Sequence, residues 1–130
     1  MLNNPFDAVQ RYVFEIEFRM LADGVAPNDI VRLSGAAGHL ADFIESCING
    51  ARYFDDLPGG LMEASIHLKQ WSYRLHYDAD NVADAVTPAQ KALVAAHVLG
   101  CCRTIGQLAR EQAHCYPQLM LIHERMTRPC

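Results

Sequence analysis

The sequence lacks long uninterrupted apolar runs, and charge of either sign is modest. No stretch approaches the roughly 20 apolar residues of a membrane-spanning helix. No basic segment is followed by an apolar one, so we expect neither a membrane anchor nor a signal peptide. Only 20% of the residues are charged while 51% are hydrophobic, which excludes a disordered chain. The formal net charge of −4 argues against a dedicated nucleic-acid-binding protein, whose surface is normally basic.

Lysine is scarce, with Lys69 and Lys91 against nine arginines, a usage that suggests a bacterial, GC-rich coding source. An even set of spaced cysteines is also missing: there are five, and Cys101 and Cys102 are adjacent. This is unlike the disulfide framework of a secreted protein and predicts reduced thiols in the cytoplasm. At 130 residues, the chain has the length of a single domain.

Alternating strand patterns are absent as well, whereas four segments repeat apolar residues with the 3.6-residue period of a helix. Asn4-Pro5 and Pro27 are typical helix starts, and Gly24 is a typical helix end. A turn at 55–60 precedes the third helix, and an acidic connection at 78–86 follows it. The fourth begins at a capping box, Thr87-Pro88-Ala89-Gln90. These elements predict an all-α fold over residues 1–130, an antiparallel four-helix bundle with a short C-terminal fifth helix.

The predicted core is read from residues spaced by three and four. The first helix contributes Phe6, Val9, Val13, Ile16 and Met20; the second Ile30, Leu33, Ala37, Leu40, Ile44, Cys47, Ala51 and Phe54; the third Leu61, Ala64, Leu68, Trp71 and Leu75. The fourth helix has a double apolar stripe around Val98–Ala109, as expected of a helix with two neighbours. Small residues spaced by four, Ser34/Gly38 and Ala92/Ala96/Gly100, suggest places of close helix approach.

Sequence motifs for catalysis and cofactors are missing. There is no Gly-x-Ser-x-Gly and no glycine-rich phosphate loop. Glu111 and His114 have the Glu-x-x-His spacing of di-iron bundles, but this spacing occurs once and falls on a polar face. His97 and Cys101 lie one turn apart and form half a zinc site with no second pair. We therefore expect no catalytic residue, no metal ligand set and no cofactor.

A calcium loop is also excluded at Asp78–Asp84. Val82 and Ala83 stand where an oxygen ligand and the turn glycine belong, and Ala89 stands where the bidentate glutamate belongs.

One surface remains as a candidate site. The third helix carries a second apolar line beside its core face, and Tyr, Met, Phe and Arg are typical of interface centres. The candidate partner-binding residues are Met62, Ile66, Tyr73, Arg74, Tyr77, Tyr53 and Phe54. Alternatively, the C-terminal helix covers this line.

We therefore expect a small cytoplasmic, non-catalytic module that binds another protein or a second copy of itself, such as an adaptor, inhibitor, chaperone or immunity-type protein. One alternative is a dimeric transcriptional or nucleic-acid-binding regulator that uses Arg103, Arg110, Arg125 or Arg128. Another is a bundle that binds a metal or a small molecule. Residues 1–84 carry a net charge of −7 and residues 85–130 carry +3, so a partner is expected to meet a charged rim.

Overall fold

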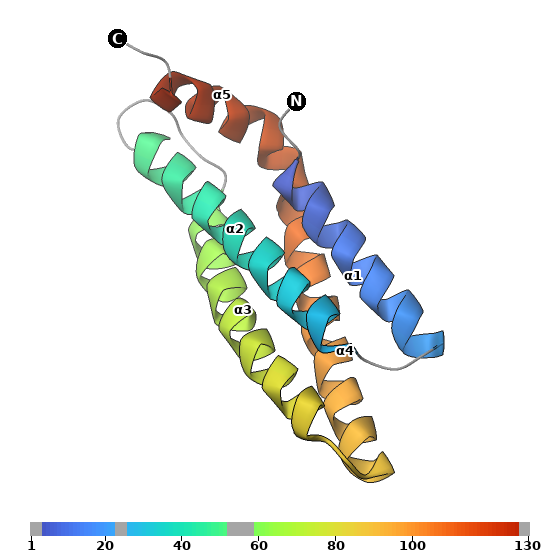
Figure 1. The fold of residues 1–130 in the computed structure, drawn as a ribbon. Helices are drawn as coiled ribbons and strands as arrows, with labels where there is room; N and C mark the ends of the chain where they lie inside the picture. Colours follow the sequence, from blue (N-terminus) through green and yellow to red (C-terminus); the bar gives the residue numbers. More distant parts are fainter. Residues whose placement is uncertain (1–3, 23–25, 52–58, 128–130) are drawn as a thin grey trace.

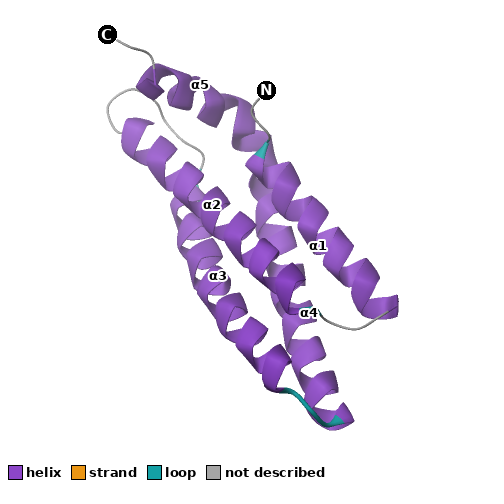
Figure 2. Cartoon of the chain, in the orientation of Figure 1, coloured by secondary structure: helices purple, strands orange, loops and turns teal. Residues whose placement is uncertain are grey.

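The computed structural model describes residues 4–22, 26–51 and 59–127, and within them every regular element is helical (Figure 2). The elements are α1 (Pro5–Ala22), α2 (Pro27–Ala51), α3 (Leu61–Asp84), α4 (Pro88–Gln112), the 3-10 turn η1 (Ala113–Cys115) and α5 (Tyr116–Thr127). Helices α1 to α4 pack against their neighbours in chain order, and α4 closes the bundle against α1 (Figure 1). The predicted helical bundle is confirmed.

The predicted caps place two of the helix starts. The Asn4 side-chain oxygen accepts a hydrogen bond from the backbone N–H of Phe6 at 2.9 Å, at the start of α1. At the start of α4, the Thr87 hydroxyl accepts from the Gln90 N–H and the Gln90 side chain accepts from the Thr87 N–H, both at 3.1 Å. These bonds satisfy N–H groups that have no partner inside the helix.

The core is the one predicted from the 3.6-residue period. The side chains of Phe6, Leu33, Leu68 and Ile105 are at most 1% exposed, and each comes from a different helix of the bundle. Leu119 and Ile122 of α5 add to the same apolar cluster. Of the predicted core residues, four are only partly buried: Met20, Trp71, Leu99 and Leu108. Phe54 lies outside the described residues.

The prediction of an acidic connection between helices at 78–86 is wrong for most of that segment. Helix α3 continues to Asp84, because Ala79 and Val82 extend the apolar spacing that begins at Leu75 and pack against the core. Asp78 is 3% exposed, so it is a buried helical residue and not part of a loop.

The prediction that small residues spaced by four mark a close helix approach is confirmed in α2 and wrong in α4. In α2, a Cβ atom added at Gly38 would lie 3.3 Å from the Ser72 hydroxyl of α3, which shows a close approach. In α4, Ala92, Ala96 and Gly100 are exposed, and nothing lies within 4 Å of a Cβ added at Gly100. Spacing alone does not tell which face of a helix meets a neighbour.

The two ends of the bundle differ. At one end α5 crosses over the end of α2, and at the other α3 and α4 extend beyond α1 and α2 (Figure 1). Exposure follows this arrangement: Val86 and Leu93, near the α3–α4 connection, are 78% and 75% exposed, whereas Val98 is fully buried.

The helical run Pro88–Met126 is long and apolar enough to cross a membrane by length and composition. A third of the tested stretch, 33%, is buried in the bundle, and one such helix is weak evidence for a membrane span.

Candidate functional site

The candidate surface on α3 faces away from the bundle. Met62, Ile66, Tyr73 and Tyr77 are 57%, 47%, 74% and 73% exposed, whereas Leu68 on the opposite side of the helix is 1% exposed. We call these four side chains the α3 outer line. Two further candidates, Tyr53 and Phe54, lie outside the described residues.

Charged side chains flank the α3 outer line on both sides. Lys69 of α3 forms an ion pair with Glu45 of α2 and lies 3.8 Å from Asp42, which is also on α2. The carboxylates raise the pKa of Lys69, chiefly through the hydrogen bond that Lys69 donates to Glu45. Arg74, the remaining candidate, is exposed and stacks over the Trp71 ring at 5.6 Å. The line therefore has a polar rim, as interface centres usually do.

Helix α5 packs on α2 rather than on the α3 outer line. The Cys47 thiol of α2 donates to the Leu119 carbonyl oxygen at 3.4 Å. The Phe43 ring lies 6.1 Å from the Tyr116 ring and 5.6 Å from the His123 ring. The alternative in which the C-terminal helix covers the line is therefore wrong.

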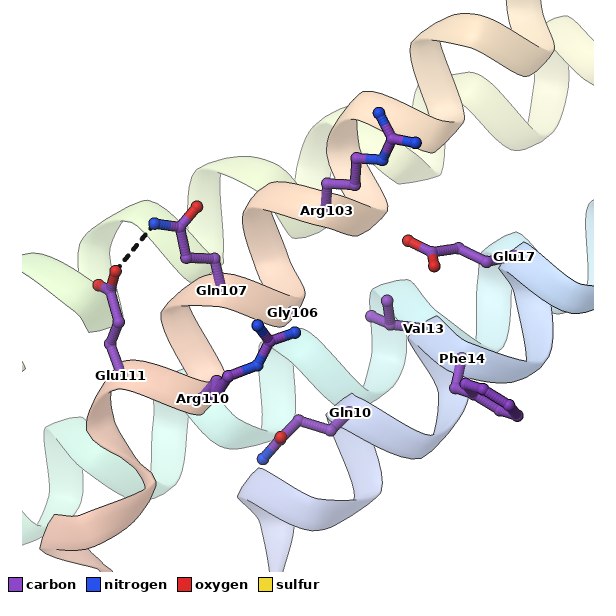
Figure 3. A pocket seen from close by; sticks show the side chains of 9 residues that line it. All are labelled: Gln10, Val13, Phe14, Glu17, Arg103, Gly106, Gln107, Arg110 and Glu111. Carbon is purple, nitrogen blue, oxygen red and sulfur yellow. Dashed lines mark hydrogen bonds between the residues drawn. The ribbon is translucent and has the colours of Figure 1, made fainter.

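A second candidate site is the open groove between α1 and α4, with a volume of about 650 Å³ (Figure 3). Gly106 brings the helices together, because a Cβ added there would lie 3.2 Å from Val13 Cγ1. The exposed ring of Phe14 lines the groove on α1. Figure 3 shows Arg110 extending from α4 toward α1, and Glu17 extending from α1 toward α4.

The groove carries no excess of positive charge. Arg103 and Arg110 line it together with Glu17 and Glu111, and Glu111 accepts a hydrogen bond from Gln107 at 2.9 Å. A phosphate-binding surface needs basic side chains in excess, so this groove does not favour the nucleic-acid alternative. Arg125 lies on α5, and Arg128 lies outside the described residues.

The di-iron and calcium patterns do not form sites in this fold. Glu111 and His114 are exposed, as are Glu63 and His67, so none of them points into the bundle core. The calcium-like segment from Asp78 to Asp84 is helical and cannot wrap around an ion as a loop.

The His97–Cys101 pair does gain a third polar neighbour, which the sequence analysis missed. The Asp78 carboxylate reaches them from α3, with Oδ2 3.3 Å from His97 Nε2 and 3.7 Å from Cys101 Sγ. Burial raises the pKa of Asp78, and the nearby His97 partly opposes this shift. Continuing the apolar spacing of Leu75 through Ala79 and Val82 would have placed Asp78 in a helix.

The buried cysteines are poor nucleophiles. Burial raises the pKa of Cys47 and Cys101 to about 11 and that of Cys102 to about 12. For Cys101, the nearby Asp78 charge contributes to this raised pKa after burial. A thiol with such a pKa holds almost no thiolate at neutral pH. These three thiols offer no support for nucleophilic catalysis.

The chain matches no known protein family, no curated protein and no solved structure.

Proposed function

We propose that this protein is a non-catalytic protein–protein interaction module whose binding surface is the α3 outer line. The observation that carries the proposal is the row of four apolar and aromatic side chains, each 47–74% exposed, on a face that no described helix covers. Exposed apolar and aromatic side chains gathered on one face of a helix are typical of binding sites. The setting we propose is the cytoplasm, which agrees with the free cysteines Cys47, Cys101, Cys102 and Cys115.

The composition of the line supports strong binding. Tyrosine supplies a large contact area at a small entropic cost, and methionine adapts its shape to the opposing surface. The two tyrosines lie one turn apart, beside Arg74, whose guanidinium lies over the Trp71 ring. Tyr and Arg are enriched among the residues that dominate binding energy.

The occupant we propose is a second copy of this chain. A twofold axis between positions 69 and 70 of two antiparallel α3 helices would place Met62 of one copy opposite Tyr77 of the other, and Ile66 opposite Tyr73. The same operation would pair Glu63 with His76, and both are exposed. An interface between identical copies must be complementary to itself in this way.

The test is sedimentation at several concentrations. We expect the wild type to form a dimer that dissociates on dilution, and Ile66→Glu and Tyr73→Lys to be monomers on their own. Because positions 66 and 73 face each other across the axis, a mixture of these two variants should form heterodimers, in which the introduced carboxylate of one chain faces the introduced ammonium group of the other.

The matched control is Phe14→Glu, which alters an equally exposed apolar side chain on α1 and should leave the dimer unchanged. A wild type that stays monomeric at high concentration would contradict self-association. A dimer that survives both α3 substitutions would place the interface elsewhere.

A further inference from the structure

A cluster of three polar side chains lies between α3 and α4, with Asp78 and Cys101 buried and His97 partly exposed. Asp78 comes from α3, and His97 and Cys101 come from successive turns of α4. Among residues 4–22, 26–51 and 59–127, this is the one group of three His, Cys, Asp or Glu side chains whose ligand atoms converge as a metal site requires. It is separate from the α3 outer line, so it is independent of the proposed function.

The spacing of the three ligand atoms fits a tetrahedral metal ion. Asp78 Oδ2 lies 3.3 Å from His97 Nε2 and 3.7 Å from Cys101 Sγ, and Sγ lies 3.9 Å from Nε2. Zinc bonds of about 2.1 Å to nitrogen or oxygen and about 2.3 Å to sulfur give tetrahedral edges of about 3.3 to 3.6 Å. Shifts of a few tenths of an ångström would bring the three atoms into this geometry.

The arrangement is unlike a Cys-His-Asp catalytic relay. In a relay the carboxylate binds one ring nitrogen of the histidine and the nucleophile binds the other. Here both Asp78 Oδ2 and Cys101 Sγ approach the same nitrogen, Nε2 of His97. Three donors that converge on one point suit a shared cation.

We infer that Asp78, His97 and Cys101 bind a divalent transition metal of the zinc class. A thiolate, an imidazole and a carboxylate are all zinc ligands, and a thiolate disfavours calcium and magnesium. The Asp78 side chain is 5% exposed, so its charge is desolvated, and a cation would compensate it. The His97 side chain is 39% exposed, so water can reach this side of the cluster and supply a fourth ligand.

The bound ion would join the two helices where their exposed extension begins. Along α4, exposure falls from 75% at Leu93 to zero at Val98, and His97 precedes Val98 directly. A metal held by one ligand of α3 and two of α4 would therefore cross-link the two helices at the start of this extension. Arg74, one turn before Asp78, adds positive charge nearby and is expected to weaken the affinity.

The experiment is a titration of chelator-treated full-length protein with Zn²⁺ in competition with a chromophoric chelator, and separately with Co²⁺. We expect one Zn²⁺ per chain and a thiolate-to-cobalt charge-transfer band in the near ultraviolet. Cys101→Ser should abolish the band, and His97→Gln should weaken Zn²⁺ binding by more than about tenfold. His97 is partly exposed, so its variant is expected to fold.

Two controls separate this cluster from the other thiols. Cys102→Ser alters the adjacent buried cysteine, and His114→Gln alters a histidine that lies 3.4 Å from the Cys115 thiol. Both should keep the stoichiometry, the affinity and the cobalt band. Absence of stoichiometric Zn²⁺ binding by the wild type would overturn the proposal, as would wild-type affinity in folded His97→Gln.

Discussion

Ser34 and Ser72 hydrogen-bond each other's helix reciprocally. The Ser34 hydroxyl donates to the Ser72 carbonyl oxygen, and the Ser72 hydroxyl donates to the Ser34 carbonyl oxygen, both at 2.8 Å. The two hydroxyl oxygens lie 3.1 Å apart. This pair fixes how α2 and α3 lie against each other, one turn away from the close approach at Gly38.

Removing either hydroxyl should therefore cost stability. Ser34→Ala and Ser72→Ala are each expected to lower the free energy of unfolding by about 1 kcal/mol. The double variant should differ from the sum by about 0.5 kcal/mol or more, because the two hydroxyls contact each other. Urea denaturation of the four proteins measures this coupling. Ser46→Ala, at an exposed position of α2, is the control and should change little; strictly additive losses would contradict the coupling.

Two glycines of α2 should respond to alanine in opposite directions. Nothing lies within 4 Å of a Cβ added at Gly35, so Gly35→Ala should stabilise the protein by about 0.5–1 kcal/mol through helix propensity. At Gly38 the added Cβ would press on the Ser72 hydroxyl at 3.3 Å, and Gly38→Ala should destabilise it. Thermal unfolding of both variants provides the comparison. If Gly38→Ala stabilised the protein, α2 and α3 would be able to move apart at this contact without a loss of stability.

The capping box of α4 should make a separate contribution to the free energy of unfolding. Thr87→Ala removes the oxygen that accepts from the Gln90 N–H and is expected to cost about 0.5–2 kcal/mol. Thr104→Ala is a matched control, because its hydroxyl donates to the Gly100 carbonyl oxygen of its own helix and caps no helix start. Chemical denaturation should show a loss at position 87 and a change within about 0.5 kcal/mol at position 104. Equal losses would contradict a capping role.

The buried thiol of Cys47 predicts a loss of stability in alkali. Its pKa rises from the ordinary 9.0 to about 11 in the folded protein, because burial disfavours the thiolate. The folded state thus holds this proton more tightly than the unfolded chain. The stabilisation is complete below pH 9 and is lost progressively as the pH rises toward 11.

The measurement is the urea midpoint of the wild type and of Cys47→Ala between pH 8 and about 10.5, across the window that linkage defines. The wild type should lose stability more steeply than the variant. Parallel curves would show that the Cys47 thiol does not titrate differently on unfolding.

Helix starts and most core residues could be predicted because each is set by local chemistry. The spacing of Ile30, Leu33 and Ala37 needs only the helical period, and the Thr87 cap needs only four consecutive residues. The α3 outer line was visible for the same reason, since Met62 and Ile66 lie one turn apart. Helix α5 leaves the α3 outer line exposed because Leu119 packs against α2. This tertiary contact could not be predicted from the local spacing of apolar residues.

The Asp78 cluster could not be predicted, because its parts come from two helices and its acidic residue suggested a loop. Polar composition at 78–84 outweighed the apolar positions Ala79 and Val82, which decide that α3 continues. The register between α3 and α4, which brings Asp78 to His97, follows from tertiary packing and from the length of the connection. The one-turn spacing of His97 and Cys101 indicated two of the three side chains and gave no sign of Asp78.

Because α3 and α4 extend beyond the rest of the bundle, the protection of backbone amides against hydrogen exchange should differ along the length of the protein. Backbone amides near the α3–α4 connection belong to helices that pack mainly on each other there, with Val86 and Leu93 largely in water. Such a segment can open while the core around Leu68 and Ile105 stays closed, because local opening requires little apolar burial to be lost. Hydrogen exchange should thus begin at this end and reach the four-helix region only on global unfolding.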